Sequence, residues 1–232
     1  MTGANGSDDR GRAARTASRA LAAAVLAAVA LVVGLMSAAM AVYPGGTWFH
    51  REARGHSFFT NFLCDLLADT ALNGTPNVLG ARLALLGMTS LVIGMLPLWL
   101  VLPTLMPDRP ALGRALRRAG TLGVSVLLFV PLATSERCGV YHSLAVELAG
   151  IPNFAALLLA VVGLLRTRYR SPPVAGIGVA LAAVALADFA WYSFYACRSE
   201  LGSPFVPGLQ KVAALMLLGW MVAVGTAVWR RA

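Results

Sequence analysis

The fold is decided by a long apolar stretch near the N-terminus, residues 20–42, which reads A-L-A-A-A-V-L-A-A-V-A-L-V-V-G-L-M-S-A-A-M-A-V. A helix needs about 20 consecutive apolar residues to cross the hydrocarbon core of a bilayer. The stretch carries no charge, and it exceeds the roughly 7–15 apolar residues of a secretory signal. We therefore expect a transmembrane helix here rather than a cleaved signal peptide.

The rest of the chain has the same apolar character. Of its 232 residues, 58% are hydrophobic and only 12% are charged, which is about half the charged fraction of an average soluble domain. The mean hydropathy is +0.73. A soluble core could not bury this much apolar surface, so we predict an all-α membrane protein with a six-transmembrane-helix bundle. The expected helices cover residues 20–42, 79–105, 120–134, 140–165, 174–196 and 206–228.

Basic residues occur in short clusters between the apolar runs. Thirteen of the 19 fall in the 1–19 tail, the 106–119 and 166–173 loops and the C-terminal end. Such clusters mark the cytoplasmic side of a membrane protein. We therefore expect a disordered cytoplasmic tail over residues 1–19, a single transmembrane domain over 20–231, and both termini in the cytoplasm of a bacterium, with the bundle in its inner membrane. Despite the net charge of +9, this pattern predicts no nucleic-acid partner.

One predicted outer loop, residues 43–78, is long for a small bundle and rich in Trp, Phe and Leu. Long loops of this kind are often functional. Within it, residues 58–72 show helical periodicity, with Asn61, Asp65 and Asp69 spaced by four along one polar side. We expect an amphipathic helix there, at the outer mouth of the bundle. The alternative for the two aspartates is that they are solvated carboxylates on a wet helix face.

Ionisable residues inside the predicted spans are few and lie mostly in their outer halves. Charges in hydrocarbon are costly and generally face the bundle interior. An alternative is that they pair for packing alone, for example Arg82 with Glu147, and another is that Asp188 and Glu147 serve a small-solute transporter. With the loop residues they form the candidate ligand-binding set: Asn61, Asp65, Asp69, Arg82, His142, Glu147 and Asp188.

A membrane-embedded hydrolase that acts on a lipid is a further alternative. Its catalytic candidates are Asp65, His142 and Asp188. Zinc accepts nitrogen and oxygen ligands, so His50, His56 and His142 could hold a zinc ion with an aspartate of the loop. No closely spaced ligand motif supports a metal site.

The three cysteines, Cys64, Cys138 and Cys197, all fall on the predicted outer side. This side is oxidising in bacteria. Cys138 and Cys197 lie in two different short loops, so we expect a disulfide between them that ties the third and fourth helices to the fifth and sixth. Cys64 is then either a small packing residue or a reactive thiol.

The segment N-F-L-C-D-L-L at residues 61–67 resembles the loop motif N-x-I-S-D-L-G of a large family of uncharacterised bacterial six-helix membrane proteins. It is more remotely similar to the I-S-D-T-G motif of the eukaryotic DRAM/Frag/Sfk proteins. Asp65 matches the motif aspartate, whereas Cys64 and Leu67 replace the usual Ser and Gly. His142 is similar to a histidine often seen at the start of the fourth helix in the bacterial group. The resemblance implies a lipid-associated membrane protein.

These observations predict a membrane protein that binds or organises lipid at an outward-facing polar cavity. Membrane lipids are the expected partners. Apart from the zinc alternative, the sequence points to no cofactor, and it leaves the oligomeric state open.

Overall fold

The computed structural model describes residues 5–197 and 205–232. These residues form helices and loops and contain no β-strand, so the all-α class is confirmed for them. Two short 3-10 helices, η1 (Leu63–Leu67) and η2 (Leu102–Leu105), accompany the α-helices. The α-helices are α1 (Asn5–Val42), α2 (Val78–Val101), α3 (Pro110–Leu127), α4 (Ser135–Cys138), α5 (Val140–Arg166), α6 (Pro172–Cys197) and α7 (Phe205–Arg231).

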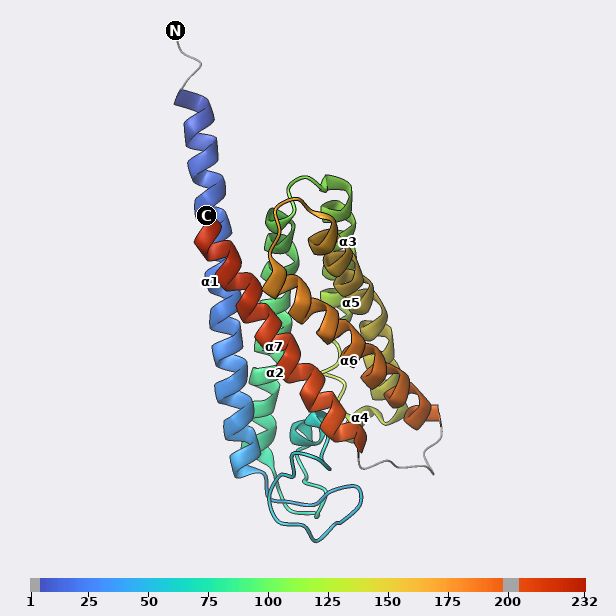
Figure 1. Ribbon diagram of the computed structural model, residues 1–232. Helices are drawn as coiled ribbons and strands as arrows, with labels where there is room; N and C mark the ends of the chain where they lie inside the picture. Colours follow the sequence, from blue (N-terminus) through green and yellow to red (C-terminus); the bar gives the residue numbers. More distant parts are fainter. Residues whose placement is uncertain (1–4, 198–204) are drawn as a thin grey trace.

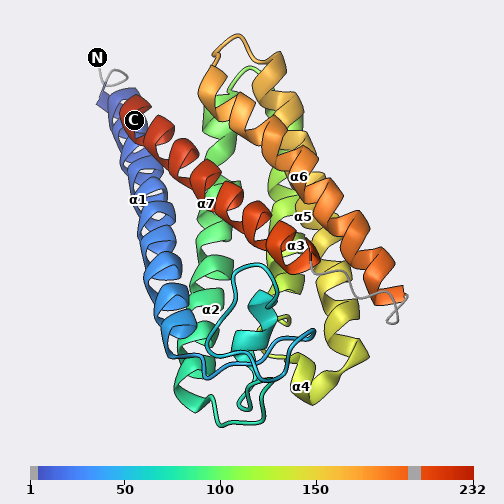
Figure 2. The same cartoon turned by 60° about the horizontal axis from the view of Figure 1, so that its bottom comes forward.

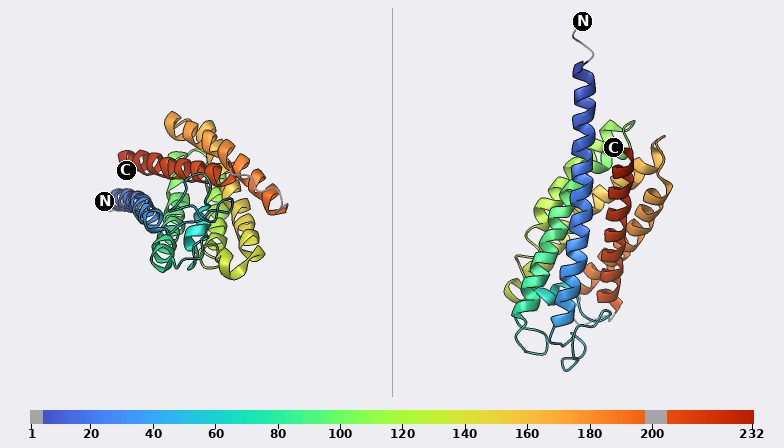
Figure 3. Two further views of the ribbon diagram at one scale, coloured as in Figure 1. Left: turned by 90° about the horizontal axis from the view of Figure 1, so that it is seen from below. Right: turned by 90° about the vertical axis from the view of Figure 1, so that its left-hand side faces the viewer.

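The long helices run back and forth between two ends of a bundle (Figure 1). The start of α1 and the end of α7 lie at one end, and the loop between α1 and α2, residues 43–77, covers the opposite end. α1 packs along α2, α3 packs along α5, and α7 lies between α1 and α6. Seen from the loop end, α6 and α7 form one side of the bundle, and the start of α1 projects beyond the other helices (Figure 3).

In the part of the chain that the structure describes, five helical segments are long and apolar enough to cross a membrane, which agrees with a multi-pass membrane protein. The segment missing from this set is α3, which has 18 residues and carries Arg114, Arg117 and Arg118. The five segments are Gly11–Val42, Val78–Leu105, Val140–Arg166, Pro172–Phe194 and Phe205–Arg231.

The prediction of a helix over residues 120–134 is wrong at both ends. α3 begins at Pro110, in the first helical turn, where the missing proline N–H costs little. It ends at Leu127, because Pro131 has no N–H to donate to the Leu127 carbonyl and its ring would clash with that carbonyl. Residues 128–134 form turns instead.

The part of the expected disordered tail that the structure describes, residues 5–19, is helical instead, because α1 already begins at Asn5. Alanine and arginine are strong helix formers and are frequent in this segment. Extending an existing helix also costs far less than starting a new one. The long apolar helix therefore continues into its polar N-terminal extension.

Close helix packing fixes the bundle around two buried tryptophans. The rings of Trp99 on α2 and Trp220 on α7 lie 6.0 Å apart, and Trp220 Nε1 donates a hydrogen bond to the Val174 carbonyl of α6 (2.9 Å). A Cβ on Gly94 would overlap Ala28, so α1 and α2 approach closely at this glycine. Small residues allow such close approach between membrane helices.

Candidate binding site

The expected amphipathic α-helix over residues 58–72 is not formed. Only Leu63–Leu67 is helical, as the single 3-10 segment η1. Asn61 explains the difference, because its Oδ1 accepts a hydrogen bond from Ser57 N (2.9 Å) and its Nδ2 donates to the Gly46 carbonyl (2.8 Å). Asparagine side chains that bond the backbone in this way compete with helix formation. The loop folds around its polar residues instead of presenting them as a stripe.

Asp65 lies at the centre of the folded loop and is only 4% exposed. Trp48 Nε1 donates to its Oδ1 (3.0 Å), while Phe62 N (2.8 Å) and Asn61 Nδ2 (3.2 Å) donate to its Oδ2. Burial raises the pKa of Asp65, and these hydrogen bonds and the charge of Lys211 oppose the rise. Both carboxylate oxygens therefore hold separate parts of the loop together.

Two consecutive residues of α7 attach the loop to the bundle. Lys211 is 2% exposed, and its Nζ donates to the Asn61 carbonyl. Gln210 Oε1 accepts a hydrogen bond from Leu63 N (2.9 Å). Neither of the two ion pairs of the described chain joins Lys211 to Asp65, so the lysine acts on that carboxylate through its nearby charge.

Asp69 has a different position from Asn61 and Asp65. It is exposed, and its Oδ2 lies 2.8 Å from Arg137 Nη2 in an ion pair with α4. Its backbone N–H donates to Glu136 Oε2 (2.8 Å). Exposed ion pairs contribute little to stability, so Asp69 marks a surface contact between the loop and α4.

The candidates in the membrane spans do not converge on Asp65. Arg82 is exposed on α2. The side chain of His142 is buried, and its Nδ1 bonds a backbone carbonyl at 2.5 Å. Glu147 accepts a hydrogen bond from Ser193 Oγ (2.7 Å), and it is not in an ion pair with Arg82 in the described structure. These three groups occupy separate surroundings.

The described residues contain no group of three His, Cys, Asp or Glu side chains that could hold a metal ion. His50 is exposed, while the His56 ring packs edge-on against Tyr43 at 5.9 Å. Burial lowers the pKa of His56 to about 4, with a smaller effect of Lys211 in the same direction. His56 is therefore a neutral packing residue at pH 7. The zinc site and the hydrolase stay predictions without support from this geometry.

The expected Cys138–Cys197 disulfide is not present, because Cys138 carries a free thiol. The side chain of Cys197 lies outside the described residues. Cys138 ends α4, which is placed by its packing on α5 and by its hydrogen bonds to Asp69, without a covalent link. Cys64 is also free, and burial raises the pKa of its thiol to about 12. A thiol that stays protonated is unreactive, which favours the packing role for Cys64.

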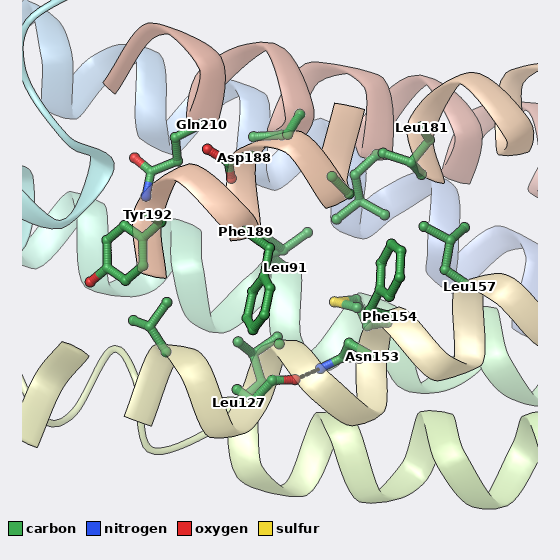
Figure 4. A pocket seen from close by; sticks show the side chains of 18 of the residues that line it. Leu91, Leu127, Asn153, Phe154, Leu157, Leu181, Asp188, Phe189, Tyr192 and Gln210 are labelled. Carbon is green, nitrogen blue, oxygen red and sulfur yellow. Dashed lines mark hydrogen bonds between the residues drawn. The ribbon is translucent and has the colours of Figure 1, made fainter. Parts of the chain in front are cut away.

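A cavity of about 300 Å³ lies among α2, α3, α5, α6 and α7 (Figure 4). Its walls are mostly aliphatic and aromatic, with contributions from each of these helices. The polar residues among those that line it are Asn153, Asp188, Tyr192 and Gln210.

Asp188 is the single member of the predicted site that lines this cavity. Its Oδ1 is buried and accepts no hydrogen bond. Figure 4 shows Asp188 near Gln210 and Tyr192 at one end, whereas Leu157 and Leu181 lie at the other. The cavity therefore has a polar end and an apolar end. Gln210 also bonds Leu63 of the loop, so the polar end is the one nearer the 43–77 loop.

Sequence reasoning left two polar residues of the spans, the buried Lys211 and the half-buried Asn153, out of the candidate set. Lys211 and Asn153 both lie inside membrane-length helices, where a polar residue is by itself a reason to suspect a role. Asn153 Nδ2 donates to the Ala149 carbonyl one turn earlier (2.9 Å), and its Oδ1 is buried without a partner. That rule, applied to every polar residue of the spans, would have found both.

A second cavity, of about 200 Å³, lies beside the first. Residues of α1, α2 and α7 line it, together with Phe58 and Leu63 of the loop, and Lys211 lies at its wall. Leu91 and Ala214 line both cavities. Neither cavity is lined by Asp65 or His142.

Comparisons with protein-family models, with curated proteins and with solved structures found no match for this chain. The resemblance of residues 61–67 to the six-helix families therefore stays a prediction from those seven residues.

Proposed function

We propose that this chain is a six-span protein of the bacterial inner membrane that binds the aliphatic chain of a membrane lipid in the cavity between α2, α3, α5, α6 and α7. Both termini and the arginine-rich loops lie in the cytoplasm in this proposal, and the 43–77 loop lies outside. The loop closes the outer end of the bundle and gives it its shape, rather than reacting with a substrate.

The six-span arrangement is supported by the direction of the helices. The two chain ends lie together and the 43–77 loop lies opposite, as an even number of crossings requires. α3 runs alongside α5, with its arginines in its first half. A short helix with basic residues at one end can cross if those side chains reach the interface.

The cavity is the observation that carries the lipid-binding proposal. Its volume of about 300 Å³ is at the lower end of the roughly 300–1,000 Å³ of small-molecule sites. That is room for one aliphatic chain. The walls, among them Trp99, Phe154 and Leu157, offer such a chain apolar contacts along its length, and a few polar groups at one end fix its orientation, as in other ligand pockets.

Photolabelling in lipid nanodiscs tests this proposal. A lipid with a diazirine near the end of its acyl chain should label peptides of α5, α6 and α7 that line the cavity. Filling the cavity with Ala185→Phe should reduce this labelling at least about tenfold, since the cavity has no room for both groups.

The matched control is Ala187→Phe on the same helix. Ala187 is exposed and does not line the cavity, so its substitution should leave labelling of the cavity unchanged. Labelling spread evenly over the exposed faces of α6 and α7, and equal in the two variants, would show that lipid only surrounds the bundle.

A further inference from the structure

The polar end of the cavity holds an acidic group, Asp188, that forms no ion pair with any described residue. Asp188 is on α6, inside a segment apolar enough to span a membrane. One of its carboxylate oxygens is buried and accepts no hydrogen bond. The two ion pairs of the described chain, Arg109–Asp108 and Arg137–Asp69, both lie elsewhere. A buried acceptor left without a donor is costly, and a charged one more so.

The neighbours of Asp188 suit a positive group. Phe189 and Tyr192 line the same cavity from the same helix, and Figure 4 shows their rings along its wall. Aromatic faces attract ammonium groups, and more strongly where water is excluded. The side-chain carbonyl oxygen of Asn153, deeper along the wall, is a second buried acceptor without a donor. These groups together offer acceptors and aromatic rings to a ligand, and the described residues that line the cavity include no cation for an anionic one.

The positive charge of Lys211 does not neutralise Asp188. It lines the second cavity rather than the first, and its ammonium donates to the carbonyls of Asn61 and Pro207. Its charge acts on Asp65. The single buried lysine is therefore engaged with the 43–77 loop and does not neutralise Asp188.

We infer that the occupant of the cavity is a single-chain amphiphile with a cationic amine head, whose ammonium pairs with Asp188 while its chain extends toward Trp99 and Leu157. This rests on the proposed function, because it names the ligand class for the same cavity. The ligand supplies a counter-charge that the described lining residues do not provide, and a carboxylate-headed chain is rejected because it would bring a second negative charge to an apolar site.

Two matched photoreactive probes test the inference in nanodiscs of neutral lipid. Both carry the same 12-carbon chain with a diazirine near its end, one with an amine head and one with a carboxylate head. The amine probe should label the cavity peptides of α5 and α6 at least about tenfold more than the carboxylate probe, which corresponds to at least about 1.4 kcal/mol. Asp188→Asn should remove most of this preference while it keeps the shape of the side chain. Glu147→Gln is the control, because Glu147 is a carboxylate in a span that does not line the cavity.

The outcomes distinguish the amine-headed ligand from the more general proposal that the cavity binds an aliphatic chain. Equal labelling of the cavity by both probes, or stronger labelling by the carboxylate probe, would leave aliphatic-chain binding intact and overturn the amine assignment. Failure of both probes to label the cavity would overturn the proposed function and the inference together. Because the comparison is made first on the unsubstituted protein, it does not depend on whether a variant folds.

Discussion

The 43–77 loop and the cavity each contain an aspartate with a buried carboxylate oxygen, and the hydrogen bonding of the two aspartates differs. Asp65 receives hydrogen bonds at both oxygens from Trp48, Asn61 and Phe62. Asp188 has a buried oxygen that receives none. A carboxylate whose oxygens are used within the protein holds a structure together. A carboxylate oxygen that accepts no hydrogen bond from the protein can accept one from a ligand. The comparison therefore assigns a structural role to the loop and a binding role to the cavity.

The largest expected effect is the loss of Asp65. Asp65→Ala leaves Trp48 Nε1 and Phe62 N without acceptors and removes the negative charge near Lys211, so the free energy of unfolding should fall by about 3 kcal/mol. Asp69→Ala removes an exposed ion pair and should cost at most about 1 kcal/mol. Thermal unfolding in nanodiscs, with hydrogen exchange of the 43–77 backbone, measures both. Equal losses in the two variants would contradict the structural role of Asp65.

A smaller effect is the coupling free energy between Asp65 and Lys211. Lys211→Met alone leaves the Asn61 carbonyl without its donor and Asp65 without the nearby positive charge. In the double variant with Asp65→Asn the charge imbalance disappears, so the two losses should sum to more than the loss in the double variant, by about 1–2 kcal/mol. Unfolding free energies of the four proteins complete the cycle. Strict additivity would mean that the two charges do not interact.

A substitution of Asp188 in the cavity should raise the free energy of unfolding rather than lower it. Asp188→Leu replaces an unpartnered acceptor in apolar surroundings with a side chain of similar size, so the empty protein should become more stable by about 1 kcal/mol. The control is Glu147→Leu, which breaks the hydrogen bond from Ser193 Oγ (2.7 Å) and should not stabilise. Thermal unfolding in nanodiscs compares the two. A clear destabilisation by Asp188→Leu would show that Asp188 has a structural partner.

A pH dependence of the loop is expected from His56. The pKa of this group in the folded protein is about 4, below the ordinary value of 6.5. Between these values the unfolded chain binds a proton that the folded chain does not, so His56 contributes stability above pH 6.5 that is lost as the pH falls toward 4.

The raised pKa of Asp65 makes the loop more stable, not less, as the pH falls. The contribution of His56 is therefore measured as the difference between the unsubstituted protein and a variant without this histidine. Hydrogen exchange of the 43–77 backbone in the unsubstituted protein and in His56→Gln, at pH 6.5 and at pH 4.5, gives that difference. The unsubstituted loop should lose more protection on acidification than the variant does. An identical loss in both would exclude His56 as the cause.

Five of the six predicted spans correspond to described helices of membrane length, because twenty apolar residues in a row admit few other structures. The bounds of the sixth were not predictable from its apolar run, since α3 begins at Pro110 and ends at Leu127. The 58–72 segment was predicted as an α-helix from its spacing. Spacing cannot say whether Asn61 will bond a carbonyl fifteen residues earlier, as it does at Gly46, because that bond depends on the folded loop.

The candidate site was predictable only as a set of residue types. The rule that ionisable groups in spans are special selected Asp188, Glu147 and His142 together. It could not separate a group with a partner, such as Glu147, from one without, because the partner Ser193 is 46 residues away. Lys211 was passed over because it lies near the start of its helix, where charged residues are common.

Ligand-induced stabilisation most directly tests the contrast between the two aspartates. Thermal unfolding in nanodiscs would be measured with and without the 12-carbon amine for Asp65→Asn and Asp188→Asn. A ligand that binds only the folded protein raises its unfolding temperature. We predict that Asp65→Asn lowers the unfolding temperature of the empty protein and keeps the rise on adding the amine. Asp188→Asn should keep the unfolding temperature and lose the rise. The reverse pattern, with Asp188→Asn destabilised but still responsive and Asp65→Asn stable but unresponsive, would contradict the assignment of structure to the loop and binding to the cavity.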